Sequence, residues 1–273
     1  MLVHPQFDPV ALSLGPVQIH WYGLTYLLAF ALFLFLAIRR VQLPHYVAAG
    51  WTRRDVEDML FYGVLGVIVG GRLGYALFYK PGYYLSHPLE VFMIWKGGMS
   101  FHGGLIGVMV ALALFAVTRK RPFLQVMDVV APCVPTGYAS GRMGNFINGE
   151  LWGKQTEVAW GFQVNGEVRH ATQLYEAALE GLLLFVLLWW FTSRPRPRLA
   201  PSGLFLVLYG GARILIEFWR EPDAQIGYLA GGWVTMGQLL SLPMLIVGLI
   251  LLWFAYTRNQ PSGNRVPEAV SSR

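Results

Sequence analysis

The chain has 273 residues, of which 55% are hydrophobic and 13% are charged, and its formal net charge is +6. Soluble domains contain about 25% charged residues on average, so this composition excludes an ordinary soluble domain and favours a protein embedded in lipid. The basic excess does not indicate nucleic acid, because that partner requires a clustered basic module and the sequence contains none. We therefore expect a lipid bilayer, and no nucleic acid, as a partner.

Hydrophobic windows long enough to cross a bilayer recur seven times, each close to the ~20 residues that span ~30 Å of hydrocarbon. The fourth window contains Pro132 and Pro135, which membranes tolerate where neighbouring groups satisfy the freed carbonyls. The sequence therefore predicts an all-α fold, a polytopic membrane protein of about seven transmembrane helices. The windows are residues 19–38, 59–78, 98–117, 124–141, 174–192, 203–218 and 234–256.

The two ends of the chain differ in composition from the apolar windows. Residues 1–18 lack the basic start and small-residue cleavage site of a secretory signal peptide. The tail from residue 259 is rich in Pro, Ser and Gly and is expected to be disordered. We expect residues 1–258 to form one transmembrane domain with short outer loops. The single cysteine, Cys133, permits no intramolecular disulfide, and its apolar neighbours indicate simple packing.

The distribution of Lys and Arg predicts the orientation of the chain. Loops on one side hold thirteen of the 21 basic residues, and loops on the other side hold six. Because basic residues are retained in the cytoplasm, the N-terminus is expected outside the membrane and the C-terminus inside the cell. The basic loops are residues 39–54, 119–121 and 194–198 and the tail from 258.

An arginine within hydrocarbon marks the first candidate site. Arg213 lies about ten residues, or roughly 15 Å, into the sixth window, and such a residue costs at least ~2.5 kcal/mol on insertion scales. Glu217 follows at i+4 on the same helical face, so we predict an ion pair. The alternative to a functional role is a structural lock between helices, although a buried pair made only for stability rarely repays its desolvation.

A second intramembrane arginine, Arg72, lies between Gly70–Gly71 and Gly74. Glycines let another helix or a lipid headgroup approach the backbone closely, so Arg72 is a candidate for binding substrate. The alternative is an arginine whose side chain snorkels to the interface for structural reasons.

The third window begins with a glycine-rich run that contains His102. We place His102 about one turn from the outer surface, where flanking glycines allow backbone and ligand to meet. The alternative is an ordinary hydrogen-bonded helix residue. The run reads Gly97-Gly98-Met99-Ser100-Phe101-His102-Gly103-Gly104.

The densest group of polar residues follows the fourth window, in residues 141–153. Arg142, Asn145, Asn148 and Glu150 supply donors and an acceptor, and the intervening glycines permit tight turns. An arginine fork together with amide groups suits a phosphate diester. The alternative is a polar loop that caps the end of a helix.

These candidates converge on the outer half of the membrane: Tyr22, Arg72, His102, Arg142 and Arg213 all map there. A transporter would require polar residues along the whole path, including the cytoplasmic half, and the sequence does not provide them. A lipid-binding scaffold would need neither His102 nor a paired Arg and Glu, and a turnover measurement would separate it from an enzyme. No metal-ligand spacing or dinucleotide fingerprint occurs, so we expect no metal and no cofactor.

The run Gly-Arg-Met-Gly-Asn-Phe-Ile-Asn-Gly-Glu at residues 141–150 resembles the signature of prolipoprotein diacylglyceryl transferases. Four other pieces resemble the same family in the same order, and the likeness extends from about residue 7 to residue 256. They are His-Trp-Tyr-Gly at 20–23, the glycine-rich run at 97–104, Gln-Leu-Tyr-Glu at 173–176 and Arg-Ile-Leu-Ile-Glu-Phe at 213–218.

The resemblance implies a seven-helix enzyme of the bacterial inner membrane whose active site faces the periplasm. Such enzymes transfer diacylglyceryl from phosphatidylglycerol to the lipobox cysteine in the signal peptide of a preprolipoprotein. They form a thioether and release glycerol phosphate in the first step of lipoprotein maturation. Two features depart from the family pattern: Ala171 follows His170 where a proline is expected, and the outer loop after Trp152 is short.

The resemblance also implies roles for individual residues. Arg142 would bind the lipid phosphate and Arg213 would assist catalysis. We assign the candidates as follows: His102, Arg213, Tyr22 and Glu217 as catalytic, and Arg142, Asn145, Asn148, Glu150, Gly153 and Arg72 as substrate-binding.

The expected chemistry needs both a base and a positive field. A cysteine thiol has a pKa near 8.5 and reacts as the thiolate. His102, whose ordinary pKa is near 6.5, could accept the thiol proton or could hydrogen-bond a headgroup, and both roles are open. Preorganised arginine donors would stabilise the charge that develops on the leaving phosphate.

Overall fold

The computed structural model describes residues 2–15, 17–222 and 227–258. The chain forms two compact units: a larger unit, Met1–Ala37 with Asp128–Arg273, and a smaller unit, Ile38–Met127. Helix α1 (Trp21–Val41) runs from the larger unit into the smaller, and α6 (Phe123–Val130) runs back. The predicted disordered tail, residues 259–273, lies outside the described residues.

In the smaller unit, the long apolar helices are α3 (Arg53–Phe78) and α5 (Phe101–Thr118). Helix α3 begins at a capping box, in which Thr52 Oγ1 accepts a hydrogen bond from Asp55 N and the Asp55 carboxylate accepts one from Thr52 N. The short elements of this unit are α2 (Pro44–Ala48), α4 (Pro81–Ser86) and the 3₁₀ helices η1 (Pro88–Phe92) and η2 (Ile94–Lys96).

Helices α3 and α5 cross along a line of glycines. A Cβ atom on Gly70 would lie 2.7 Å from the Cα of Gly107, and one on Gly107 would lie 2.9 Å from the Cα of Gly70. Gly66 and Gly103 are equally close to the facing backbone, and the four-residue spacing puts each pair on one helical face. Small residues allow this approach in membranes, where packing replaces the hydrophobic driving force.

The larger unit is built from α1, α6 and four further helical segments. Residues Thr172–Phe191 form one continuous rod, whose middle is a π-helix. Within it Gly181 lies against Ala139 of α7, where an added Cβ would meet the alanine Cβ at 2.5 Å. The segments are α7 (Val134–Ile147), the rod made of α8 (Thr172–Glu176), η3 (Ala177–Leu183) and α9 (Leu184–Phe191), α10 (Ala200–Ile216) and α11 (Met236–Thr257).

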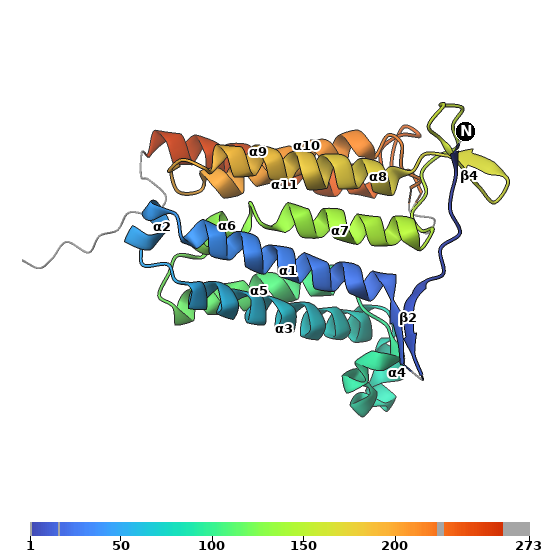
Figure 1. Ribbon diagram of the computed structural model, residues 1–273, viewed down its shortest axis with the longest axis horizontal. Helices are drawn as coiled ribbons and strands as arrows, with labels where there is room; N and C mark the ends of the chain where they lie inside the picture. The colour runs from blue at the N-terminus through green and yellow to red at the C-terminus, as the bar shows by residue number, and fades with distance from the viewer. Residues whose placement is uncertain (1, 16, 223–226, 259–273) are drawn as a thin grey trace, which may run out of the picture. The chain divides into compact units, whose positions relative to one another are not determined.

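The described part of the larger unit also contains short strands in two small sheets. In the first sheet β1 (Leu2–Val3) pairs in parallel with β4 (Phe162–Val164), which forms an antiparallel hairpin with β5 (Glu167–Arg169). In the second, β2 (Val10–Leu14) and β3 (Val17–His20) form a hairpin that leads into α1. Figure 1 shows β4 at the end of this unit where α7 ends and α8 begins.

The predicted all-α class is therefore correct for the helical spans, whereas the strands were not predicted. All seven predicted windows are helical, but only five helices among the described residues have the length and apolarity to cross a membrane. The fourth window is two helices, because Pro132 cannot donate a hydrogen bond to α6 and Pro135 sits in the first turn of α7. Helix α10, at 17 residues, is short, so the fourth and sixth spans remain predictions.

A buried carboxylate sets the start of α10. The Asp128 side chain, at the end of α6, accepts hydrogen bonds from Leu199 N at 2.9 Å, Ser202 N at 3.1 Å and Ser202 Oγ at 2.6 Å. The first N–H groups of a helix lack intrahelical partners, and an anion at that end is favoured by the helix dipole. Asp128 therefore fixes the position of α10, which carries Arg213 at its other end.

The glycine crossing makes a testable prediction. Gly70→Ala places a methyl group against the backbone of α5, and such overpacking costs about 1–3 kcal/mol. Gly63→Ala is the matched control on the same helix, because nothing lies within 4 Å of its added Cβ and alanine favours helix by up to about 1 kcal/mol. Thermal unfolding in detergent should show a lower Tm for Gly70→Ala and an equal or higher Tm for Gly63→Ala. Equal stability of both variants would contradict the close crossing.

Candidate active site

One carboxylate, that of Glu176 in α8, collects three arginines. Its exposed fraction is 0%. Its Oε2 lies 2.5 Å from Arg142 Nε of α7 and 3.3 Å from Arg213 Nη1 of α10, and its Oε1 contacts Arg220 Nη1. The Tyr138 hydroxyl donates a hydrogen bond to Oε2 at 3.0 Å. Groups far apart in the sequence therefore meet at one buried anion.

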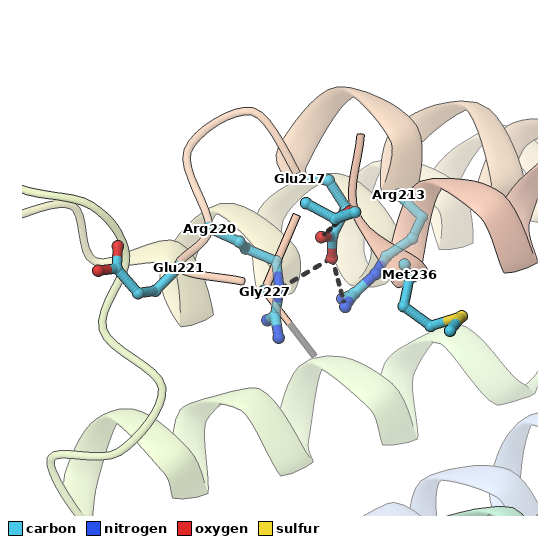
Figure 2. A pocket seen from close by; sticks show the side chains of 8 residues that line it. Arg213, Glu217, Arg220, Glu221, Gly227 and Met236 are labelled. Atoms are coloured by element: carbon cyan, nitrogen blue, oxygen red, sulfur yellow. Dashed lines mark hydrogen bonds and ion pairs between the residues drawn. The ribbon is translucent and has the colours of Figure 1, made fainter. Parts of the chain in front are cut away.

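The predicted ion pair between Arg213 and Glu217 is confirmed, with Nη2 and Oε1 2.7 Å apart. Glu217 Oε1 also lies 3.0 Å from Arg220 Nε, and Glu217 Oε2 accepts a hydrogen bond from Thr235 Oγ1 at 2.7 Å. Figure 2 shows the Arg213 and Arg220 guanidinium groups directed at the Glu217 carboxylate from two sides. Arg213 also lies 3.9 Å from Glu180, so the pair belongs to a larger ionic network.

The position of Arg213 within its helix differs from the predicted one. The predicted window, residues 203–218, put Arg213 near its middle. The helix instead begins at Ala200 and ends at Ile216, so Arg213 lies in its last turn. The helix starts before the apolar window does, where Asp128 binds its first N–H groups, and it ends before the window does. The depth of Arg213 in the membrane stays a prediction.

A pocket opens beside this network, between the end of α10 and the start of α11 (Figure 2). Two guanidinium groups and the Glu217 carboxylate face it. Gly237 leaves room for this carboxylate, since an added Cβ would lie 2.5 Å from the Glu217 carboxyl carbon. The lining residues are Arg213, Glu217, Arg220, Glu221, Gly227, Thr235, Met236 and Gly237.

The structure also brings together the polar residues predicted around Arg142. Arg142 Nη1 donates to Asn145 Oδ1 at 3.1 Å, and Asn145 Nδ2 donates to Glu150 Oε2 at 3.1 Å. Asn148 Nδ2 donates to Glu150 Oε1 at 3.2 Å. Arg142 Nη2 donates to the Tyr138 hydroxyl at 2.7 Å. Because each terminal nitrogen carries two N–H groups, each keeps a second N–H beyond these contacts within the described chain.

Gly153 lies in a tightly packed position that leaves no room for a side chain. A Cβ atom would meet Thr172 Cγ2 at 2.5 Å and His170 Cβ at 3.1 Å. The Gly153 N–H donates to the His170 carbonyl at 2.8 Å. Burial lowers the pKa of the His170 imidazole, whose Nδ1 lies 3.0 Å from the Tyr175 hydroxyl. Gly153 thus holds the loop after Glu150 against the start of α8.

Tyr22 lies in the first turn of α1, which packs against α7 in the larger unit. Its hydroxyl is 3.2 Å from that of Tyr26. One turn on, the carbonyl of Thr25 accepts a hydrogen bond from Ser140 Oγ at 2.8 Å, and the Thr25 side chain fills the space beside Gly144. Tyr22 is therefore carried on a helix that is fixed to the one bearing Arg142.

The two remaining predicted residues, His102 and Arg72, belong to the smaller unit. His102 lies in the first turn of α5, and its side chain is exposed. Arg72 is buried, and its N–H groups donate to backbone carbonyls of residues 90–98. These contacts favour the structural alternative for Arg72, and binding of substrate by Arg72 stays a prediction.

Sequence analysis missed several members of the network. Glu176 was noted only as part of a motif, and Arg220 was counted only among the loop charges. Two signals could have found them: Arg213, Glu217 and Arg220 follow the i, i+4, i+7 spacing of one helical face, and Glu176 and Glu180 are acids inside an apolar window. Among the described residues, no group of three or more His, Cys, Asp or Glu side chains is arranged to hold a metal ion.

The central role of Glu176 predicts a large loss of stability when its charge is removed. Glu176→Gln keeps the size of the side chain but leaves Arg142, Arg213 and Arg220 without their common counter-charge. Breaking a buried ionic network at one partner typically costs about 3–5 kcal/mol, which thermal unfolding in detergent would record as a lower Tm. Glu167→Gln is the control, because that pair with Arg169 is exposed and worth about 0–1 kcal/mol. Equal Tm values for the two variants would contradict the role.

Comparisons with known proteins agree with the resemblance found in the sequence. A family model described as prolipoprotein diacylglyceryl transferase matches residues 9–254. A protein of Methylibium petroleiphilum named phosphatidylglycerol–prolipoprotein diacylglyceryl transferase is 62% identical over 259 residues, covering 93% of this chain and 97% of its own length. Proteins of the same name from Polaromonas sp. and Cupriavidus pinatubonensis are 58% and 55% identical, covering 94% and 98% of this chain and 97% and 98% of their own lengths. The chain therefore belongs to the prolipoprotein diacylglyceryl transferase family.

Proposed function

We propose that this chain transfers diacylglyceryl from phosphatidylglycerol to the lipobox cysteine of preprolipoproteins, the first step of bacterial lipoprotein maturation. Its relatives are named for phosphatidylglycerol and prolipoprotein. The structural observation that carries the proposal is the cluster of three arginines around Glu176 in a chain of apolar helices. A lipid phosphate diester calls for such fixed, positively charged donors.

The reaction is a substitution at the glycerol methylene carbon that bears the phosphate. The cysteine thiolate donates an electron pair to that carbon, a carbon–sulfur bond forms, and the carbon–oxygen bond to phosphate breaks. The leaving oxygen takes the bonding pair, so the products are a diacylglyceryl thioether and glycerol phosphate. Negative charge moves from sulfur to the phosphate, and catalysis therefore requires cationic donors at the phosphate in the transition state.

We assign Arg142 to binding the phosphate of the lipid in the ground state. Its contacts with Glu176, Asn145 and Tyr138 fix the guanidinium plane. Within the part of the chain that the structure describes, each terminal nitrogen keeps one N–H for a ligand. Two parallel N–H groups match two phosphate oxygens, which a lysine ammonium cannot do. Asn145, Asn148, Glu150 and Gly153 support this position through the polar chain and loop described above.

We assign Arg213 to stabilising the negative charge that develops on the leaving phosphate. Glu217 and Glu176 hold its two terminal nitrogens at 2.7 Å and 3.3 Å, and its guanidinium lines the pocket at the end of α10. A donor held in this way needs no reorganisation when charge appears. We assign Glu217 and Arg220 to positioning Arg213. We also assign Tyr22 to this site, because its helix α1 is attached to α7, which carries Arg142.

His102, in the smaller unit, is the remaining residue that we assign to catalysis. Its exposed imidazole could accept the thiol proton or donate to a headgroup, and a pH profile of turnover separates the two roles. We further propose that residues 1–258 act as one catalytic domain of the inner membrane with seven spans. The N-terminus lies in the periplasm, the C-terminus lies in the cytoplasm, and the site faces the periplasm. The basic loops support this orientation.

The proposal is tested by incubating the purified protein with phosphatidylglycerol and a lipobox peptide, then weighing the peptide by mass spectrometry. Transfer predicts a mass increase equal to one diacylglyceryl group and loss of the free thiol. Failure to modify the peptide with any phosphatidylglycerol would refute the transferase function and leave a lipid-binding scaffold or a transporter as the explanation.

In the same assay, Arg142→Lys is expected to lower kcat/KM by at least about tenfold, because a single ammonium cannot replace a two-point contact. The protein should still accumulate in the membrane. Arg194→Lys, in the exposed loop between α9 and α10, is the matched control and should transfer normally. Near-normal transfer by Arg142→Lys would remove the phosphate role from this residue.

The proposed orientation predicts which loops react with a membrane-impermeant thiol reagent in intact cells. Cys133 is buried, so a Cys133→Ala background gives a clean chain for single cysteines. Trp160→Cys should label from outside, and Lys120→Cys should label only after the cells are opened. The reverse pattern would invert the topology and place the site on the cytoplasmic side.

A further inference from the structure

Backbone carbonyls accept hydrogen bonds from Arg72, and the Tyr84 ring centroid lies 5.2 Å from its guanidinium carbon. Its exposed fraction is 3%, and each of its five N–H groups has an acceptor. Nε donates to the Val91 carbonyl at 2.8 Å, and Nη2 donates to those of Glu90 at 2.7 Å and Met93 at 3.1 Å. Nη1 donates to the carbonyls of Gly97 and Gly98. A guanidinium has five N–H donors in a fixed plane, so one side chain ties down the whole of residues 90–98.

This segment has little hydrophobic core to hold it. Phe92 and Trp95 are 75% and 76% exposed, so their side chains contribute little packing within the unit. Gly97 and Gly98 adopt φ values of +75° and +82°, which only glycine adopts without strain. The path of the backbone therefore depends on the arginine rather than on buried side chains.

The segment leads directly into the turn that carries His102. The Gly97 and Gly98 carbonyls bind Arg72, and two residues later Ser100 N donates to the Gly71 carbonyl at 2.8 Å. Ser100 Oγ then caps α5 by accepting a hydrogen bond from Gly103 N at 3.1 Å. The first turn of α5 is thus attached to α3 at residues 71 and 72.

We propose that Arg72 is a positioning residue: it fixes the start of α5 and so holds the His102 imidazole where the transfer reaction needs it. This inference rests on the role proposed for His102, and it replaces direct binding of the lipid headgroup by Arg72. Lysine offers three N–H groups from one nitrogen, so it cannot reach five carbonyls spread over nine residues. Arg72→Lys keeps the charge and removes the geometry.

The first arm of the test measures the backbone directly in the full-length protein. Hydrogen–deuterium exchange of Arg72→Lys should be at least tenfold faster at the amides of residues 97–104 and unchanged in β4 and β5. Arg54→Lys, an exposed arginine near the start of the same helix, is the matched control and should exchange like the wild type. Unchanged exchange at residues 97–104 in Arg72→Lys would overturn the anchoring role.

The second arm separates positioning from substrate binding. Arg72→Lys should lower kcat at least tenfold with less than a twofold change in the KM for phosphatidylglycerol. In a His102→Gln background the same substitution should change kcat less than twofold, because coupled residues are not additive. A rise in KM that accounts for the loss would mean direct headgroup binding, and an equal loss in both backgrounds would mean that Arg72 acts without His102. Either result overturns the proposal.

The two arms also distinguish this inference from the proposed function. Wild-type protein that transfers no diacylglyceryl refutes the function, while the exchange arm still decides whether Arg72 anchors the segment. Normal transfer by His102→Gln refutes the role of the histidine and with it the positioning role of Arg72. If His102→Gln has no measurable turnover, the double variant gives no information. The exchange rates of Arg72→Lys and its separate effects on kcat and KM then test the positioning role.

Discussion

The arrangement of the larger unit depends on one buried carboxylate, that of Glu176. Three guanidinium groups brought together in an apolar surrounding would repel one another and lose their hydration. Glu176 contacts all three, and Glu217 and Glu180 add further negative charge nearby. Removing charges from water is tolerated only with good geometry and matching partners. The network therefore allows three arginines to be kept, in fixed orientations, in the interior of the larger unit.

Close packing of the helices brings these side chains together. Asp128 fixes the start of α10, and Gly181 lets the rod that carries Glu176 lie against α7. Gly153 holds the loop after Glu150 against the start of that rod, and Gly237 leaves room for the Glu217 carboxylate. A Cβ added at Gly181, Gly153 or Gly237 would lie within 2.5 Å of a neighbouring atom, and both carboxylate oxygens of Asp128 accept hydrogen bonds. The π-helical turn in the rod is a further irregularity of the kind that often accompanies functional sites.

Sequence alone could predict the contacts that are local along one helix or loop. The spacing of Arg213 and Glu217 identified their ion pair, and residues 141–150 identified the polar chain from Arg142 to Glu150. The contact between Arg142 and Glu176 joins two helices, and no period within either one reveals it. Arg220 was missed because it lies just beyond the apolar window, although its spacing from Arg213 and Glu217 places it on their helical face. The strands of two to five residues are too short to show a clear alternation.

The guanidinium groups of Arg72 and Arg142 have different kinds of partner, and this difference bears on function. All five N–H groups of Arg72 donate to neutral backbone carbonyls, which is the observation behind the positioning role proposed for it. Arg142 instead pairs its charge with Glu176, and among the described residues one N–H on each terminal nitrogen has no acceptor. A phosphate diester could therefore bind Arg142 without displacing the carboxylate that orients it. Such a site needs no rearrangement when the substrate arrives, which is the condition under which fixed donors stabilise a developing charge most effectively.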